Sequence, residues 1–192
     1  PLRQEGVEIR PIRQVTGTSE FNEVFFDGAW ADDADVVGEV DGGYMALEGV
    51  LSAGRAGLAA EMSGAAQAAF KMTTDYLKER KQFGKVIGSF QALQHRAAHL
   101  YSELELVKSV VLKALQDLDE NYGMAGVTCT LAKAKAGEVA KLASQEAVQM
   151  HGGIGMTDEF DIGFYMKRIR VAQEMFGDTA FHADRLAQLR GY

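Results

Sequence analysis

An apolar stripe in the middle of the chain constrains its fold more than any other feature. Nine apolar residues recur at alternating spacings of three and four positions: Phe90, Leu93, Ala97, Leu100, Leu104, Val107, Val111, Ala114 and Leu118. This spacing places all of them on one face of an α-helix. A long helix with a single apolar face must bury that face against neighbours, so the stripe predicts packed helices.

Helical periodicity also covers most of the chain after Gly43. The pattern predicts a second long helix over residues 44–80, an alanine-rich helix over residues 123–150, and a last helix broken into residues 160–173 and 179–189. No proline interrupts these segments. We therefore expect a mainly α protein built as an up-and-down four-helix bundle.

Glycines lie inside the second predicted helix at Gly54, Gly57 and Gly64. Glycine in a helix interior costs about 1 kcal/mol relative to alanine. We therefore expect the backbone there to approach another helix or a ligand closely. The apolar side of this helix is expected to carry Leu47, Val50, Leu51, Leu58 and Met62.

The start of the chain has a different pattern. The segments "VEIRPIRQV" and "NEVFFDG" alternate apolar with polar residues and are rich in β-branched and aromatic types, which favours short strands. A few strands cannot close a sheet or cover its faces. We predict that residues 1–41 are the end of a β domain, that residues 42–192 are a helical bundle domain, and that both belong to a larger protein.

Composition excludes several classes of partner. The net charge is −7, and acidic and basic residues are interleaved, which disfavours nucleic acid and anionic membranes as partners. No apolar run is long enough to span a bilayer. With a single cysteine, Cys129, the chain has no intrachain disulfide, and a cytoplasmic location is expected. Small molecules and other proteins remain as partners.

Metal binding is not predicted. His95 and His99 have the i, i+4 spacing of two ligands on one helix, but no acidic residue follows the first histidine and no third ligand is evident. Cys129 has no partner base in the sequence, so we expect a small buried apolar residue.

Three stretches leave structural and functional interpretations open. "ERKQFGK", residues 79–85, fits a helix end with Gly84 as a left-handed stop, but its basic cluster and aromatic also suit a ligand. "QMHGGIG", residues 149–155, has more glycines than one turn requires. "QEMFGDTAFH", residues 173–182, interrupts the last helix at Gly177 and Asp178.

These stretches carry a family resemblance. "RKQFGKVIGSFQALQH" and, further on, "QMHGGIGMTDEFDIGFYMKRIRVAQEMFGD" resemble the acyl-CoA dehydrogenase family, and residues 20–44 resemble the exit from its middle β domain. The resemblance covers essentially the whole chain. Family members are usually much longer, so the resemblance implies that an N-terminal helical domain and most of the β domain are absent here.

The resemblance implies FAD as the cofactor, an acyl-CoA as the substrate, and electron-transfer flavoprotein as a partner. It also implies a homotetramer or heterotetramer in which Arg80 reaches the FAD pyrophosphate of a neighbouring subunit. The other positions matching FAD contacts are Gln82, Phe83, Phe90, Gln91, Gln149 and Gly153. Arg55 and Gly177 match residues beside the substrate.

The same resemblance implies that the usual base is missing. The family's reaction, α,β-dehydrogenation, needs a carboxylate to remove the α-proton. Most members carry it at the position of Phe176, and a minority at the position of Gly54, neither of which can accept a proton here. The nearest carboxylates are Asp178 and Glu174, and Glu174 lies about 200° around a helix from position 176.

Two hypotheses compete. The chain belongs to a subunit without its own base, paired with a homologous subunit that carries one, as in a heteromeric pimeloyl-CoA dehydrogenase whose small subunit it resembles. Alternatively, Asp178 or Glu174 is a relocated base in a homotetramer. Outside both stand a flavin monooxygenase of the same fold and a purely structural bundle.

Overall fold

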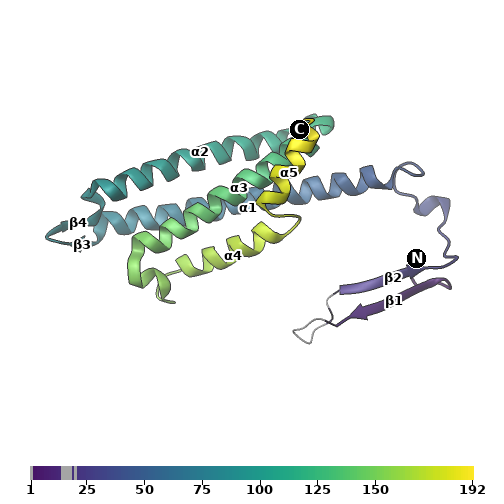
Figure 1. Cartoon of the computed structure of the whole chain (residues 1–192), viewed down its shortest axis with the longest axis horizontal. Helices are drawn as coiled ribbons and strands as arrows, with labels where there is room; N and C mark the ends of the chain where they lie inside the picture. Colours follow the sequence, from purple (N-terminus) through teal and green to yellow (C-terminus); the bar gives the residue numbers. More distant parts are fainter. Residues whose placement is uncertain (1, 14–18, 20) are drawn as a thin grey trace. The chain divides into compact units, whose positions relative to one another are not determined.

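The computed structural model describes residues 2–13, 19 and 21–192 of the chain. Its secondary structure is mainly helical, as predicted (Figure 1). The chain forms two compact units, Pro1–Ala46 and Leu47–Tyr192. Within the described residues, no helix is both long and apolar enough to cross a membrane.

The first unit contains the predicted strands as a β-hairpin. Strand β1, Val7–Ile12, pairs antiparallel with β2, Phe21–Phe26, in a register that sets Val7 opposite Phe26. A short 3-10 helix, η1, follows at Asp33–Asp35. Apolar side chains of both strands stay exposed: Ile9, Ile12, Val24, Phe25 and Phe26. Two strands alone do not cover these side chains.

The second unit contains the helices, whose ends lie within two residues of those predicted. The long helices are α1, Gly43–Glu79, which begins in the first unit, α2, Gln91–Glu120, and α3, Tyr122–His151. The broken last helix is α4, Ile162–Glu174, followed by α5, Thr179–Leu189. Shorter elements connect them: β3, Lys81–Gln82, β4, Lys85–Val86, and the 3-10 helices η2, Ile87–Ser89, and η3, Gly152–Met156.

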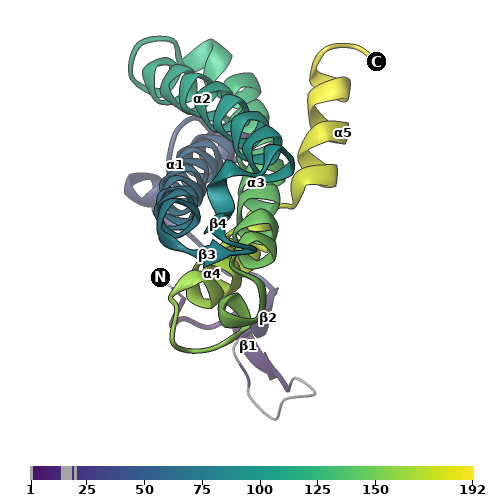
Figure 2. The same ribbon diagram turned by 90° about the vertical axis from the view of Figure 1, so that its left-hand side faces the viewer.

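The bundle is arranged around α3. Viewed along the bundle, α1, α2 and α3 lie together, and α4 and α5 each pack against α3 (Figure 2). The stripe predicted on α2 is the buried one, since Leu100, Leu104 and Val107 are all at most 2% exposed. Opposite it, α3 presents mainly alanine: Ala132, Ala136, Ala140 and Ala143. Large side chains on α2 thus meet small ones on α3, which lets the helices pack closely.

Two expectations for α1 were partly wrong. Leu47 and Val50 are 55% and 71% exposed, because the apolar core on α1 begins only at Ala56. A side chain added at Gly57 or Gly64 would meet no atom within 4 Å, so these glycines do not mark close approaches within the protein. At Gly54 a close neighbour does exist, but it is an aromatic ring from the turn after α4 and not another helix or a ligand.

Candidate functional site

A tight hairpin separates α1 from α2. Strands β3 and β4 pair antiparallel, and the two residues between them, Phe83 and Gly84, have φ angles of 54° and 76°. Two successive residues with left-handed backbones form the type of turn that is favoured in two-residue β-hairpins. Gly84 is therefore a hairpin residue and not the predicted helix stop, since α1 already ends at Glu79. The hairpin leaves Phe83 at its tip, 88% exposed.

The glycines that follow α3 have separate roles. Gly152 ends the helix with a φ of 66°. Gly155 is required by packing, because a Cβ there would lie 2.9 Å from the Cβ of His151 and 3.0 Å from the carbonyl oxygen of Val148. Gly153 has no such constraint, and a Cβ there would meet no atom within 4 Å. Its exposed backbone is thus available to a ligand.

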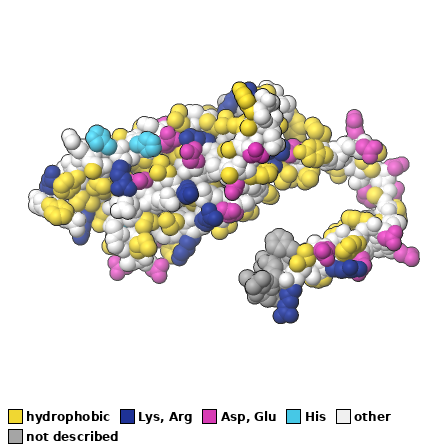
Figure 3. Space-filling model, in the orientation of Figure 1, with side chains coloured by type: hydrophobic (Ala, Val, Ile, Leu, Met, Phe, Trp, Pro, Cys, Tyr) yellow, Lys and Arg dark blue, Asp and Glu magenta, His cyan; other side chains and the backbone are white. Residues whose placement is uncertain are grey.

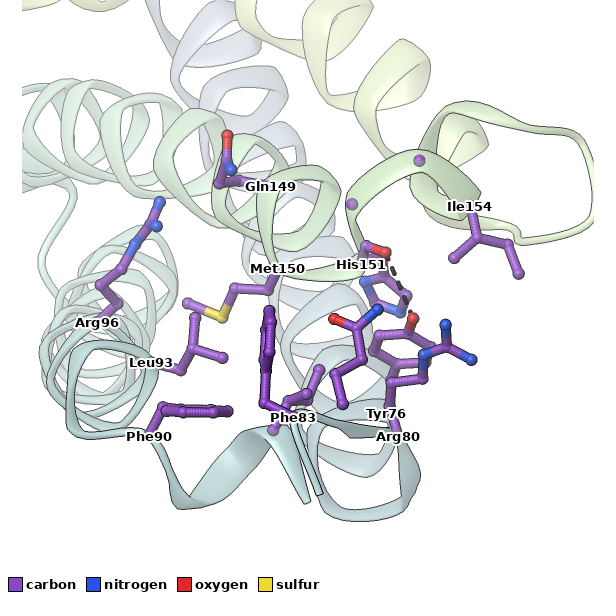
Figure 4. Close-up of a pocket in the computed structure, with 14 residues that line it drawn as sticks. Tyr76, Arg80, Phe83, Phe90, Leu93, Arg96, Gln149, Met150, His151 and Ile154 are labelled. Atoms are coloured by element: carbon purple, nitrogen blue, oxygen red, sulfur yellow. Dashed lines mark hydrogen bonds between the residues drawn. The ribbon is translucent and has the colours of Figure 1, made fainter. Parts of the chain in front are cut away.

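A cavity of about 560 Å³ lies between the hairpin and the end of α3 (Figure 4). Its wall includes six of the seven residues that the resemblance assigned to the cofactor, namely Arg80, Gln82, Phe83, Phe90, Gln149 and Gly153. The seventh, Gln91, is exposed on the first turn of α2 and does not line the cavity. Residues far apart in the sequence are therefore brought to one place.

This cavity has the chemistry of a site for an anion that carries rings. Among the described residues, no carboxylate pairs with the guanidinium of Arg80, whereas Arg96 is paired with Glu146 at 2.6 Å. The ring of Phe90 lies 6.1 Å from that of Phe83, edge to face. Figure 3 shows basic side chains among hydrophobic ones at this end of the bundle. An unpaired cation, open backbone and aromatic faces suit a phosphate group and a ring system.

A second region lies at the turn between α4 and α5. Phe176 and Gly177 both have left-handed backbones, with φ angles of 57° and 100°. A Cβ on Gly177 would lie 2.4 Å from Cδ1 of Phe181, so only glycine fits there. A phenylalanine in the left-handed region is an outlier and needs support from its surroundings.

The ring of Phe176 packs directly on Gly54 of α1. A Cβ at Gly54 would lie 2.7 Å from Cε2 of this ring and 3.1 Å from Cδ2. The two positions at which the resemblance expected a base are therefore neighbours in space. Neither provides a group that accepts a proton.

The two alternative carboxylates are engaged elsewhere. Oδ1 of Asp178 caps α5 by accepting a hydrogen bond from the amide of Phe181 at 2.8 Å. Glu174 is half exposed and pairs with Arg170 at 3.0 Å. Both carboxylates line a separate cavity of about 360 Å³, and neither Phe176 nor Gly54 belongs to its wall.

Below the turn lie two buried side chains that sequence reasoning missed. Lys133 of α3 is 1% exposed, and its Nζ donates to the carbonyl oxygens of Gln173 and Gly177 at 2.9 and 2.8 Å. His182 of α5 is fully buried, and its Nε2 donates to the carbonyl oxygen of Phe176 at 2.9 Å. Burial lowers the pKa of Lys133 to about 8 and, together with the charge of Arg55, that of His182 to about 4.

Arg55 lies next to Gly54 on α1 but is almost fully buried. Its Nη1 donates to Oε1 of Glu48, which also accepts a hydrogen bond from Nη2 of Arg185 at 2.6 Å. One carboxylate thus holds two arginines, one from α1 and one from α5. Sequence reasoning missed Glu48, although its spacing of seven residues from Arg55 places both on one face of a helix.

The remaining candidates lie apart from both regions. His95 and His99 are exposed on α2, where Figure 3 shows histidine on the surface. Within the described part of the chain, no three histidine, cysteine or acidic residues are grouped to hold a metal ion. Cys129 is buried in the core, as predicted.

Comparison with known proteins gives consistent similarities. The chain is 32% identical over 165 residues to the mitochondrial short/branched chain specific acyl-CoA dehydrogenase of Bos taurus, covering 86% of this chain and 38% of that protein. It superimposes on glutaryl-coenzyme A dehydrogenase in complex with glutaryl-CoA with a TM-score of 0.78 and 26% identity, over 100% of this chain and 49% of that one. A chain in the structure of the electron transferring flavoprotein of Acidaminococcus fermentans gives the same TM-score at 27% identity, over 98% and 50%.

The chain therefore spans about two fifths to one half of the length of these proteins. Residues 41–189 match the family described as "Acyl-CoA dehydrogenase, C-terminal domain". Because this match covers most of the 192 residues, the chain belongs to the acyl-CoA dehydrogenase family and carries its C-terminal domain.

Proposed function

We propose that this chain is part of an FAD-dependent acyl-CoA dehydrogenase subunit that lacks its own base and works beside a homologous subunit that supplies one. The contact between Phe176 and Gly54 carries the proposal. It fills both seats of the base with groups that cannot accept a proton.

The cavity of about 560 Å³ supports FAD as the cofactor. Arg80 would hold a pyrophosphate, because an unpaired guanidinium is suited to that anion. The backbone at Gly153 and the side chain of Gln149 would contact the adenosine, and Phe83 and Phe90 would cover ring surfaces. When bound, FAD accepts the β-hydrogen of the acyl-CoA as a hydride.

An exposed cavity at one end of the bundle also fits an assembly of several subunits. We propose that a neighbouring subunit completes this site in a homotetramer or heterotetramer. We include the first unit, with its uncovered apolar strands, in the proposal as the end of a middle β domain. Electron-transfer flavoprotein is the proposed electron acceptor.

A relocated base receives no support from the geometry. Asp178 is used as a helix cap, Glu174 is paired and exposed, and both face a cavity that excludes position 176. Asp178→Asn tests this directly, since asparagine caps a helix as well as aspartate does but cannot take up a proton.

The decisive experiment uses the full-length protein loaded with FAD, kept without oxygen and mixed with saturated acyl-CoA thioesters. We expect no reduction of the flavin absorbance by the protein alone, and reduction when the homologous subunit is present. Reduction by the protein alone that disappears in Asp178→Asn or Glu174→Gln would establish the relocated base instead. Rapid reaction of reduced flavin with oxygen and hydroxylation of a substrate would indicate a monooxygenase.

A further inference from the structure

The turn between α4 and α5 is held from inside the bundle. Two of its carbonyl oxygens, those of Phe176 and Gly177, and that of Gln173 at the end of α4 accept hydrogen bonds from buried side chains. Lys133 supplies two of these bonds and His182 the third. The donors come from two different helices, α3 and α5, so the turn is fixed from both sides.

Burial of the charged Lys133 at this place costs free energy. Its ammonium is removed from water, and among the described residues no carboxylate lies within ion-pair distance of it. A buried cation that has only carbonyl partners costs more than an apolar side chain of the same length. Packing alone would favour methionine here, so the charge points to a role beyond filling space.

That role follows from the backbone of the turn. Phe176 and Gly177 are both left-handed, a conformation that a phenylalanine does not adopt without support. Releasing the carbonyl oxygens on either side of Phe176 would let the backbone return to a commoner conformation. The side chain at position 176 would then no longer project onto Gly54.

We propose that Lys133 is a positioning residue that sets where the side chain at position 176 projects. It does so by holding the carbonyl oxygens of Gln173 and Gly177, while His182 holds that of Phe176. This inference rests on the proposed function, since the projection matters for catalysis only where the turn walls an acyl-CoA site.

The first test does not depend on activity. 4-Fluorophenylalanine is placed at position 176 of the full-length protein, and its ¹⁹F resonance is compared in the natural background, in Lys133→Met and in Lys108→Met. Lys108 is a surface lysine of α2 and serves as the matched control. We expect a shifted and broadened resonance in Lys133→Met only, and an unchanged resonance there overturns the inference. If Lys133→Met does not fold, Lys133→Gln decides, because its amide keeps one hydrogen bond and the expected shift is smaller.

The second test separates the inference from the proposed function. Phe176→Glu restores a carboxylate to the seat and is expected to let the protein reduce its flavin alone, with Phe176→Gln as the control. Adding Lys133→Met is expected to lower kcat about tenfold or more while KM stays nearly constant, since a misplaced base fails in the transition state. No gain from Phe176→Glu contradicts the proposed function and leaves the ¹⁹F result standing. A gain that Lys133→Met does not reduce contradicts the positioning role.

Discussion

The ring of Phe176 fills the space that a side chain at position 54 would need, since a Cβ on Gly54 would lie 2.7 Å from this ring. The absence of a base at each position is visible in the sequence, but their contact is not. The ring covers the backbone of α1 at Gly54, so neither position leaves room for a second side chain there. A change at one of the two positions is therefore felt at the other.

This contact predicts that alanine substitutions at two glycines of the same helix change the stability of the protein by different amounts. Gly57→Ala should stabilise the protein by about 1 kcal/mol, because alanine favours the helix and nothing lies near the added Cβ. Gly54→Ala should lose most of that gain, because the ring of Phe176 must move. In a Phe176→Ala background, the gain at Gly54 should return. Chemical denaturation of the four variants measures this, and equal gains at Gly54 and Gly57 in the natural background would contradict the contact.

Glycines beside the cavity predict a separation of binding from stability. Gly153→Ala should weaken FAD binding with little effect on stability, since its Cβ meets no protein atom and Gly153 lines the cavity proposed for the ligand. Gly155→Ala should destabilise the protein, because its Cβ would clash with the backbone of Val148. Retained FAD and thermal unfolding of each purified variant give the two readouts. Loss of stability in Gly153→Ala would show that the open position is misassigned.

Arg80 predicts a salt-dependent contribution to FAD binding. Arg80→Met should weaken FAD binding by roughly tenfold to a hundredfold, as expected for loss of a charged hydrogen bond of about 1.5–3 kcal/mol. Lys78→Met, two residues earlier at the exposed end of α1, is the control and should change little. Titration of the apoprotein with FAD at two salt concentrations measures the effect. Equal affinities of Arg80→Met and the natural protein would place the pyrophosphate elsewhere.

His182 predicts a loss of stability in acid. Its pKa is about 4 in the folded protein, against 6.5 as the ordinary value, so the unfolded chain binds the proton first. The stability that depends on neutral His182 is complete above pH 6.5 and is lost as the pH falls towards 4, by about 3 kcal/mol at most. His182→Gln keeps a donor for the carbonyl of Phe176 and should lack this component. Denaturation curves at several pH values that run parallel for both proteins would contradict the assignment.

Lys133 predicts a dependence of the same sign as that of His182, but in the alkaline range. Its pKa is about 8 in the folded protein and 10.5 as the ordinary value, so burial of the charge opposes folding most strongly below pH 8. The free energy of unfolding should rise between about pH 8 and 10.5, because Lys133 has released its proton in the folded protein and still holds it in the unfolded chain. Lys133→Met should not show this rise. A rise that persists in Lys133→Met would have to come from another group.

The helices and their core could be predicted because periodicity records them directly. The stripe on α2 and the ends of α1 and α5 follow from residues that repeat at helical spacing. Of the two interpretations left open for residues 79–85, the helix stop at Gly84 does not hold, and the sequence does not exclude it because a glycine near a helix end suits a helix stop and a hairpin turn equally. Only the left-handed backbone of Phe83 distinguishes the hairpin turn from the helix stop, and a phenylalanine in the sequence does not indicate such a backbone.

The polar residues under the turn could not be predicted, because lysine and histidine usually lie on the surface. A signal for Lys133 does exist in the sequence. It stands between Cys129 and Ala136, four residues after one and three before the other, on a stripe that is otherwise buried. For His182 no such stripe is present, and its partner, the carbonyl oxygen of Phe176, leaves no trace in a sequence.

Within the described residues, Lys133 and His182 donate only to main-chain oxygens at the end of α4 and in the turn, so these hydrogen bonds do not depend on which side chain stands at position 176. The main chain around position 176 is in this sense fixed independently of the side chain that this position carries. A substitution of the side chain at position 176 is therefore expected to leave these three main-chain hydrogen bonds in place. The proposed function makes the same point a test: in this fixed main chain, one substitution at position 176 should be enough to add or remove a proton acceptor.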